Sequence, residues 1–596
     1  MRGRDRMKKK SAFKALGHVM LCSLKENPKG LLLELACGMI EGFQSLPQAV
    51  FPAMVINAAL GQQQPGKVLV LAGVFAFVMF LLYYIASFIG TLQGWYMVRL
   101  PHIFQRKLVK KSLLLDFRDV DNADRINQYV HALEMTFRFC DTPSKLIRTG
   151  LTSMIELAVL ASLLSTLDGI VAAALVVYAV GVYFLNRKVA AISKKKEDEK
   201  VLARRKADYA QELMFSGEFA KDSRAYGANS MVRNKFRQAA DEVVEIEKRG
   251  QKTLFGWEAL QEAISAGQNL FLYLFMIVKY AAGAISIGSF TMYVSAANSL
   301  YRSVSRLLQM YASAMDFPMY FRDYQDYMEL SEEMRQTARQ GLHIEPDHCP
   351  TIEFCNVSFR YPSRSEYALR NVNLTIPPCG SVAVVGENGA GKSTFVKLLL
   401  RLYDVTEGEI LVDGHDIREY PYDEYMRLFS TVFQDFIIFI YSVKENIGFD
   451  RAEKEYLEAA MKKAGVYQCI ERLPKKEKTI LGKRYDSEGV DLSGGEKQKV
   501  AIARAFYKDV SVAVLDEPTA ALDPLAEYEV YHNFQKFAAD KTAIYISHRM
   551  SSSRFCDQIL VFSEGQVAES GTHAELMEKK GIYYNMYEKQ SSYYSS

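Results

Sequence analysis

Residues 386–394 read Gly386-Glu387-Asn388-Gly389-Ala390-Gly391-Lys392-Ser393-Thr394, and they lie between two apolar runs, residues 381–385 and 395–400. The first run predicts a strand and the second a helix, so the glycines form the turn between them. Such a loop leaves backbone N–H groups and a helix N-terminus open to a polyphosphate. Lys392 is expected to reach the β- and γ-phosphates, and the Ser393 hydroxyl to hold Mg²⁺. The turn therefore predicts a site for a nucleoside triphosphate.

Length and composition limit the class of the protein. At 596 residues the chain is too long for one ordinary core, so at least two domains are expected. A net charge of +4 is too small to indicate nucleic-acid binding. The eight cysteines show no metal-ligand spacing, and reduced structural thiols are expected. Long apolar runs fill the first half of the chain, whereas short apolar strands alternate with charged segments in the second.

Six apolar stretches in the first half are long enough to cross a bilayer, which takes about 20 residues. They lie near Gly30–Leu60, Val68–Tyr96, Leu146–Leu167, Gly169–Asn186, Phe255–Tyr280 and Ile287–Tyr311. Pro47 and Pro52 are expected to bend the first. The connections after the second and fourth stretches are long and rich in Lys and Arg, so these connections and both termini are expected in the cytosol. Six buried helices of a soluble protein are the disfavoured alternative.

The two long connections are expected to be helical hairpins that reach into the cytosol. Each contains one irregular point that suits a turn or a helix cap, Asp116–Asp121 in the first and Phe215–Phe219 in the second. We hypothesise that these two tips dock on the nucleotide-binding part of the chain. A solvated loop is the alternative at each point.

The motifs that surround the phosphate loop resemble a known family. From Thr351 to about Lys589 the chain is similar to an ABC-transporter nucleotide-binding domain, and the six-span half is similar to the membrane domain of ABC exporters of the bacterial multidrug and peptide type. The resemblance implies an all-α polytopic membrane domain followed by an α/β P-loop ATPase domain. The expected boundaries are a cytosolic segment at 1–29, the membrane domain at 30–325, a linker at 326–350 and the ATPase domain at 351–596.

The resemblance also implies roles for single residues. Tyr361 matches the aromatic residue that stacks on adenine, and Gln434 matches the glutamine that contacts Mg²⁺ and senses the membrane domain. Ser493, Gly494 and Gly495 match the signature that contacts the γ-phosphate across a dimer interface. The family most often has Gln where this chain has Glu496, a replacement that is not read as inactivating.

A buried strand, residues 512–516, is predicted to end in two carboxylates. Asp516 is expected to hold Mg²⁺ through water, and Glu517 to polarise the attacking water as general base. Asp523 matches the loop that crosses to a partner, and His548 matches the histidine that contacts the γ-phosphate. The expected catalytic set is Glu517, His548 and Gln434; the Mg²⁺ set is Ser393, Gln434 and Asp516; the ATP set is Tyr361, Gly386, Glu387, Asn388, Gly389, Ala390, Gly391, Lys392, Ser393, Thr394, Ser493, Gly494, Gly495 and Asp523.

The chain has one copy of each motif, whereas each ATP in the family lies between the phosphate loop of one domain and the signature of another. Two chains are therefore expected, as a homodimer or a heterodimer. Polar residues within the apolar stretches indicate a cargo cavity. They are Glu41, Gln44 and Gln48 in the first stretch, and Glu258, Gln261 and Glu262 in the fifth. We hypothesise a cavity that prefers cationic or amphipathic cargo, with helix–helix hydrogen bonding as the alternative.

These expectations combine into one function. The chain is expected to be a half-transporter that lies in the lipid bilayer of the cytoplasmic membrane and couples ATP and Mg²⁺ to export, with a peptide, a drug-like amphipath or a lipid as cargo. The alternative is an ATP-gated regulator or channel-like membrane protein that moves no cargo. A fused importer is disfavoured by the long helical connections.

Overall fold

The structure is a computed structural model that describes residues 2–61, 64–164, 169–215, 217–336, 342–345, 348–483, 486–518, 524–547 and 550–595. The chain divides into two compact units. The helical unit comprises Met1–Leu113 and Asp124–Leu330, and the sheet unit comprises Leu114–Ala123 and Ser331–Ser596.

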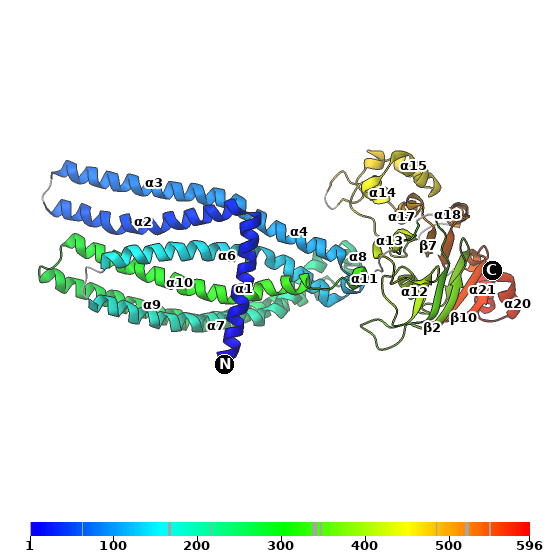
Figure 1. The fold of residues 1–596 in the computed structure, drawn as a ribbon, viewed down its shortest axis with the longest axis horizontal. Coiled ribbons are helices and arrows are strands. Elements are labelled where there is room, and N and C mark those ends of the chain that lie inside the picture. Colours follow the sequence, from blue (N-terminus) through cyan, green and yellow to red (C-terminus); the bar gives the residue numbers. More distant parts are fainter. Residues whose placement is uncertain are drawn as a thin grey trace. The chain divides into compact units, whose positions relative to one another are not determined.

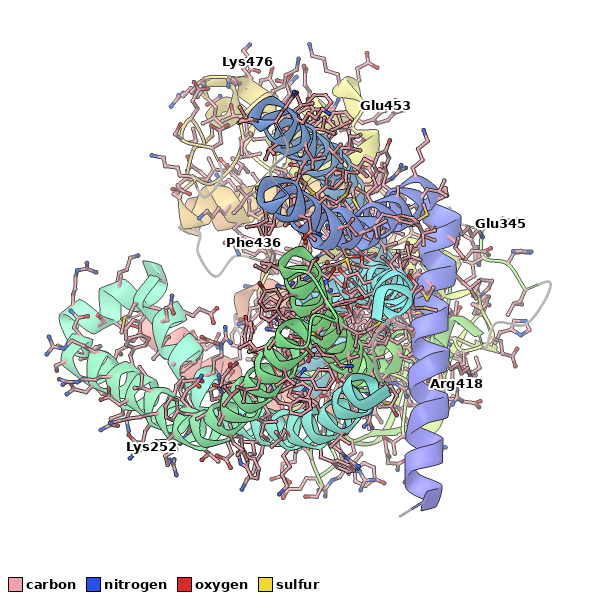
Figure 2. All side chains as sticks on the ribbon, turned by 90° about the vertical axis from the view of Figure 1, so that its left-hand side faces the viewer. Lys252, Glu345, Arg418, Phe436, Glu453 and Lys476 are labelled. Carbon is pink, nitrogen blue, oxygen red and sulfur yellow. The ribbon has the colours of Figure 1, made fainter. Side chains whose placement is uncertain are left out.

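The helical unit is a bundle of long helices (Figure 1). Its elements are α1 (Arg2–Glu26), α2 (Pro28–Leu60), α3 (Pro65–Met97), α4 (Arg99–Leu114), α6 (Ala123–Leu164), α7 (Gly169–Phe215), α8 (Gly217–Ala225), α9 (Asn229–Ala281) and α10 (Ile287–Met328). Helices α2, α3, α6, α7, α9 and α10 run side by side, and α1 crosses them. Figure 2 looks along the bundle and shows α2 and α3 grouped apart from α7 and α9.

Each of the six predicted apolar stretches lies in one of these long helices, although residues 165–167 of the third fall outside the described part. Pro47 and Pro52 lie inside α2, which continues through both. Among the described residues, one helical stretch, Pro65–Leu114, is long and apolar enough by composition alone to cross a membrane. The membrane crossing of the other helices stays a prediction.

Helices α7 and α9 are joined by charged and aromatic contacts. Glu247 on α9 accepts hydrogen bonds from Lys196 and Lys200 on α7, at 2.7 and 2.8 Å. The Lys188 ammonium lies 4.6 Å from the centre of the Trp257 ring. Two lysines on one carboxylate hold the pKa of Glu247 near 2, chiefly through the Lys196 hydrogen bond. The basic connection after the fourth apolar stretch is thus a helical hairpin, as its composition predicts.

Helices α2, α6 and α10 share buried and part-buried polar contacts. Arg148 on α6 donates to both carboxylate oxygens of Glu41 on α2, with its Nε 3.0 Å from Oε2. Glu156, also on α6, accepts hydrogen bonds from Ser303 and Arg306 on α10. The charge of Glu41 is therefore compensated within the bundle. At this residue the contacts favour helix–helix hydrogen bonding over an acidic cavity.

The sheet unit contains two sheets. The antiparallel sheet has the order β2-β1-β4-β5, with β1 (Ile352–Phe359), β2 (Leu369–Ile376), β4 (Glu407–Val412) and β5 (His415–Asp416). The larger sheet has the order β10-β9-β3-β8-β7-β6, with β3 (Ser381–Gly386), β6 (Phe429–Val432), β7 (Val512–Asp516), β8 (Thr542–Ile546), β9 (Gln558–Ser563) and β10 (Gln566–Gly571). All of its strand pairs are parallel except β9 with β10.

Helices surround the larger sheet, and every residue of β7 and β8 is buried. Burial on both faces is the usual condition of parallel strands. The helices are α12 (Lys392–Leu399), α13 (Tyr422–Arg427), α14 (Val443–Gly448), α15 (Lys454–Lys463), α16 (Tyr467–Glu471), α17 (Gly494–Lys508), α18 (Pro524–Phe537), α19 (Met550–Ser553), α20 (His573–Lys579) and α21 (Ile582–Ser595). Two short helices, α5 (Phe117–Val120) and α11 (Glu333–Gln336), complete the unit.

The first predicted tip, Asp116–Asp121, is part of the sheet unit, as the docking hypothesis requires. The Tyr403 hydroxyl donates to Asp121 Oδ2 at 2.6 Å, and the Phe117 ring packs edge-on against Tyr403 at 5.7 Å between centroids. Asp116 is buried and accepts the backbone N–H of Met334 at 3.3 Å. The second tip, Phe215–Phe219, includes Ser216, which lies outside the described residues, and its docking stays a prediction.

The pairing of Glu41 with Arg148 generates a stability prediction. Glu41→Gln removes the carboxylate that is hydrogen-bonded to the Arg148 guanidinium, and removing one partner from a part-buried pair costs about 1–3 kcal/mol. We expect a lower thermal unfolding midpoint for Glu41→Gln in detergent, and partial recovery in the double variant Glu41→Gln/Arg148→Gln.

Glu258→Gln is the matched control because the Glu258 side chain on α9 is exposed. This variant should unfold at the wild-type temperature. Equal midpoints for Glu41→Gln and Glu258→Gln would contradict the role given to the pair.

Candidate nucleotide-binding site

The candidate site is built where four parallel strands end. Strands β3, β8, β7 and β6 are neighbours that run in one direction, so their carboxyl ends meet at one edge of the sheet. The phosphate loop follows β3, Gln434 follows β6, and Glu517 follows β7. Ligands of open parallel sheets bind outside this edge. The fold thus brings together residues that lie more than 100 positions apart in the chain.

The phosphate loop depends on glycine at two positions. Gly386 has φ +155°, and a Cβ on it would lie 2.4 Å from the carbonyl oxygen of Phe562 on β9. Gly391 has φ +106°, and a Cβ there would lie 2.5 Å from Leu369 Cδ2. Both backbone conformations are rare for other residues. The phosphate loop therefore packs against β9 and β2 in this conformation only because Gly386 and Gly391 have no side chain.

Lys392 begins α12 and lies over the loop. Its Nζ donates to the carbonyl oxygens of Gly386 and Glu387, at 2.8 and 3.0 Å. Burial lowers the pKa of Lys392, while the charges of Glu517 and Asp516 oppose that shift. The ammonium is therefore held in the loop and interacts electrostatically with the carboxylates that follow β7. Ser393, the next residue, has an exposed side chain.

The two carboxylates at the end of β7 differ in environment. Asp516 is buried, and burial, followed by the charges of Glu517 and Asp435, raises its pKa to about 6. Glu517 is half-buried and has φ +47°, an uncommon conformation for a residue with a side chain. The Gln434 amide donates to Glu517 Oε2 at 2.9 Å. Gln434 and Glu517, two members of the expected catalytic set, are thus in direct contact.

The donor set at this edge fits Mg²⁺. The hydroxyl of Ser393, the amide oxygen of Gln434 and the carboxylate of Asp516 are the oxygen ligands that Mg²⁺ prefers, and it commonly takes only one or two carboxylates alongside phosphate oxygens. Among the described residues there is no group of three or more His, Cys, Asp and Glu that could hold a metal ion. An all-protein metal cage is therefore not found in that part of the chain.

Tyr361 lies beside the helix that begins at the phosphate loop. Its hydroxyl is 3.1 Å from the Thr394 hydroxyl, and its ring packs edge-on against Phe359 and Tyr403, at 4.9 and 5.4 Å between centroids. The Lys397 ammonium lies 5.5 Å from the centre of the Tyr361 ring. The aromatic ring predicted to bind adenine is thus fixed next to α12, and Tyr403 connects it to the docked tip.

The signature residues begin α17. The Ser493 hydroxyl accepts the N–H of Glu496 at 3.3 Å, and Glu496 Oε2 accepts the N–H of Ser493 at 2.8 Å, which is a reciprocal helix cap. The Cys469 thiol donates to Glu496 Oε1 at 2.9 Å, and this bond is the largest cause of the lowered pKa of Glu496. Glu496 therefore takes the capping place that a glutamine also fills. Within the described residues, no hydrogen bond joins Ser493 to the phosphate loop.

Two expected site residues, Asp523 and His548, lie outside the described residues, and their roles stay predictions.

Two further residues that interact with the site were not predicted from the sequence. Asp435 adds negative charge beside Asp516, and its position directly after Gln434 was a usable signal. Lys397 lies within about 6 Å of three aromatic rings, those of Phe117, Tyr361 and Tyr403. Nothing in the local sequence indicates that Lys397 lies near these three rings.

The close approach of Gly386 to β9 generates a binding prediction. Gly386→Ala places a methyl group against the Phe562 carbonyl, so the loop must shift. We expect its affinity for trinitrophenyl-ATP, measured by fluorescence titration, to fall by about 10-fold or more, the factor that 1.4 kcal/mol gives.

Gly414→Ala is the matched control. Gly414 also has a positive φ, +78°, but no atom lies within 4 Å of its added Cβ. It should bind the nucleotide like the wild type, with only a small loss of stability. Wild-type affinity in Gly386→Ala would contradict the steric account of the loop.

The comparisons with known proteins agree with this geometry. Residues 369–520 match the model of the ABC transporter family. A subtilin transport ATP-binding protein of Bacillus subtilis is 32% identical over 404 residues, which are 65% of this chain and 63% of that protein. The ATP-dependent lipid A-core flippase of Escherichia coli K12 is 38% identical over 258 residues, 43% of this chain and 44% of the flippase. The chain thus spans less than two thirds of the length of either relative.

The fold also matches a solved structure over nearly its whole length. A bacterial Atm1-family ABC exporter with ATP bound superposes with a TM-score of 0.78 and 24% identity, covering 96% of this chain and 99% of that one. At this sequence identity the match shows the fold alone. It agrees with the expected helical membrane-type domain followed by an α/β ATPase domain. Residues 369–520 are similar to the ABC transporter family, and the chain that carries them has the fold of an Atm1-family ABC exporter.

Proposed function

We propose that this chain hydrolyses ATP to drive export of a cargo across a membrane, as one half of a two-chain transporter. The observation that carries this proposal is the convergence of Lys392, Gln434, Asp516 and Glu517 at one edge of the parallel sheet. Such a set combines a cation for phosphate oxygens, oxygen ligands for Mg²⁺ and a general base. The similarity to a subtilin transport protein and to a lipid A-core flippase supports the same function.

The chemistry follows from the position of each group. Backbone N–H groups of residues 387–392 and the Lys392 ammonium bind the phosphates, and Tyr361 supplies a flat apolar face for the adenine. Ser393, Gln434 and Asp516 would hold Mg²⁺, which would supply charge neutralisation on the phosphates. Glu517 accepts a proton from the attacking water, and the hydrogen bond from Gln434 orients its carboxylate. We assign His548 to the γ-phosphate on its motif.

A second chain completes the site in this proposal. Ser493 caps α17, and the N–H groups of the first turn of a helix suit a phosphate. Its contacts are with Glu496 on its own helix. A phosphate presented by a partner chain brings the signature and the phosphate loop together, and we assign Asp523 to this junction on its motif.

The cargo that we propose is a peptide or a lipid with an apolar part. One relative is named for subtilin transport, and the other is named a lipid A-core flippase. Since Arg148 compensates Glu41, the acidic character of a cavity rests on Glu258 and Glu262, whose side chains are exposed on α9. We place the protein in the cytoplasmic membrane, with both termini in the cytosol.

The docked tip gives this function a route for coupling. Asp121 bonds Tyr403, the Tyr403 ring packs on Tyr361, and Tyr361 bonds Thr394 in the first turn of α12. A change at the adenine or the phosphates therefore acts on groups that also hold the tip. A chain of contacts couples two sites only when a segment has two arrangements and both sites shift the balance between them. The coupling between the nucleotide site and the tip is therefore a matter for experiment.

The function is tested by the ATPase activity of the full chain in lipid nanodiscs. Glu517→Gln keeps the side-chain size but removes the general base, and we expect the rate to fall by roughly 100- to 10,000-fold while ATP still binds. Glu345→Gln, at an exposed carboxylate labelled in Figure 2, should hydrolyse ATP at the wild-type rate. A fully active Glu517→Gln variant would overturn the assignment of the base.

The coupling route is tested by hydrogen exchange of residues 114–123. In the wild type, ATP should change the exchange rate of this segment. Tyr403→Phe removes the bond to Asp121, and a hydrogen bond to a charge contributes about 1.5–3 kcal/mol, so the response of the segment should shrink. ATP affinity should stay within about twofold because the ring that packs on Tyr361 is kept.

Tyr420→Phe is the control, since the Tyr420 hydroxyl donates to the Val412 carbonyl on β4 at 3.0 Å and not to Asp121. If segment 114–123 responded to ATP as strongly in Tyr403→Phe as in the wild type, the Tyr403–Asp121 bond would not couple the tip to the nucleotide site.

A further inference from the structure

Two cysteines from distant parts of the sequence meet on one carbonyl group. Cys349 precedes β1, and Cys379 lies in the turn that precedes β3. The Cys349 thiol donates to the Asp540 carbonyl at 3.3 Å, and the Cys379 thiol donates to the same oxygen at 3.6 Å. All eight cysteines of the chain are free thiols. The pair is therefore two reduced sulfurs in contact with a common atom.

The two thiols also contact each other. A hydrogen bond in which the Cys379 thiol keeps its proton and donates to Cys349 is the largest cause that raises the pKa of Cys379 to about 11, followed by burial. The backbone N–H of Cys379 donates to Thr542 Oγ1 at 3.0 Å, which fixes the turn. The Cys379 side chain is exposed, and that of Cys349 is half-buried. Reagents can therefore reach the pair, and its backbone on the Cys379 side is held by β8.

A cavity lies beside the pair. It has a volume of about 230 Å³, and its lining includes Cys379, Cys556, Phe555 and Asp557. Apolar and polar atoms both line it, so a small polar molecule with an apolar part can enter. We propose that the Cys349–Cys379 pair is a redox modification site, which closes to an intramolecular disulfide when a low-molecular-weight disulfide reaches the exposed Cys379 sulfur beside this cavity.

The reaction balances in two exchanges. The Cys379 thiolate attacks one sulfur of the small disulfide, forms a mixed disulfide and releases one thiolate. The Cys349 thiolate then attacks the Cys379 sulfur, forms the Cys349–Cys379 bond and releases the second thiolate. The two released thiolates take up the two protons that the cysteines lost. The two protein thiols are oxidised by two electrons, and the small disulfide is reduced to two thiols.

The raised pKa sets the pace of the first exchange. Only the thiolate attacks a disulfide, and little of Cys379 is ionised at neutral pH. The pair thus stays reduced in a cytosol with excess thiol and closes under sustained oxidation. Closure ties the chain before β1 to the turn before β3, the strand that leads to the phosphate loop. A closed loop of this kind stabilises the folded state by restricting the unfolded chain.

The test uses the full chain in detergent with glutathione disulfide as the probe. After incubation, iodoacetamide blocks the remaining thiols, and mass spectrometry of the digest locates each cysteine. We expect a peptide that joins Cys349 to Cys379, which dithiothreitol separates, together with an upward shift of the unfolding temperature that dithiothreitol reverses. Cys349→Ser should stop at a glutathione adduct on Cys379.

Cys556→Ser is the control because Cys556 lines the same cavity but is not part of the pair. It should form the Cys349–Cys379 bond as the wild type does. The proposal would be overturned if Cys349 and Cys379 were both recovered as alkylated thiols, or if a glutathione adduct persisted on wild-type Cys379. It would also be overturned by a Cys379–Cys556 bond or by a bond between two chains. The readout is chemical and needs no nucleotide, so its failure is distinct from a failure of the ATPase proposal.

Discussion

The parallel pairing of β3, β8, β7 and β6 is the constraint on which the candidate site depends. All five residues of β7 and all five of β8 are buried, so both strands lie between layers of side chains. A shift in the register of their parallel pairing would expose apolar groups. Because all four strands end at one edge, the residue that follows each strand is delivered to one place. Gln434 and Glu517, 83 positions apart, touch for this reason.

The sequence predicted this convergence in part. The glycine spacing and the apolar runs on either side identify the phosphate loop, and the alternation of short strands with helices indicates an α/β domain. The six long helices follow from the length of the apolar stretches. What the sequence did not indicate are contacts between residues that no local pattern connects. Arg148 with Glu41, Lys397 with three aromatic rings, and Cys349 with Cys379 each depend on how distant elements pack.

The contact of Arg148 with Glu41 also changes how the polar face of α2 is understood. A carboxylate in an apolar helix indicates either a cavity or a partner, and local spacing cannot distinguish the two. The partner lies more than 100 residues away on α6. A guanidinium that donates to both carboxylate oxygens is the strongest kind of ion pair available to this residue. The face therefore holds helices together at Glu41, and the search for cargo contacts moves to α9.

The first tip belongs to the sheet unit although the flanking helical segments, Met1–Leu113 and Asp124–Leu330, form the other unit. Its own contacts must hold it there, and they are not equal. Arg118 bonds Glu333 at 2.5 Å, but both side chains are well exposed, and such pairs contribute about 1 kcal/mol or less. The Asp116 side chain is 2% exposed and accepts the Met334 N–H. A buried carboxylate deprived of that N–H is strongly penalised, so Asp116 is the anchor of the tip.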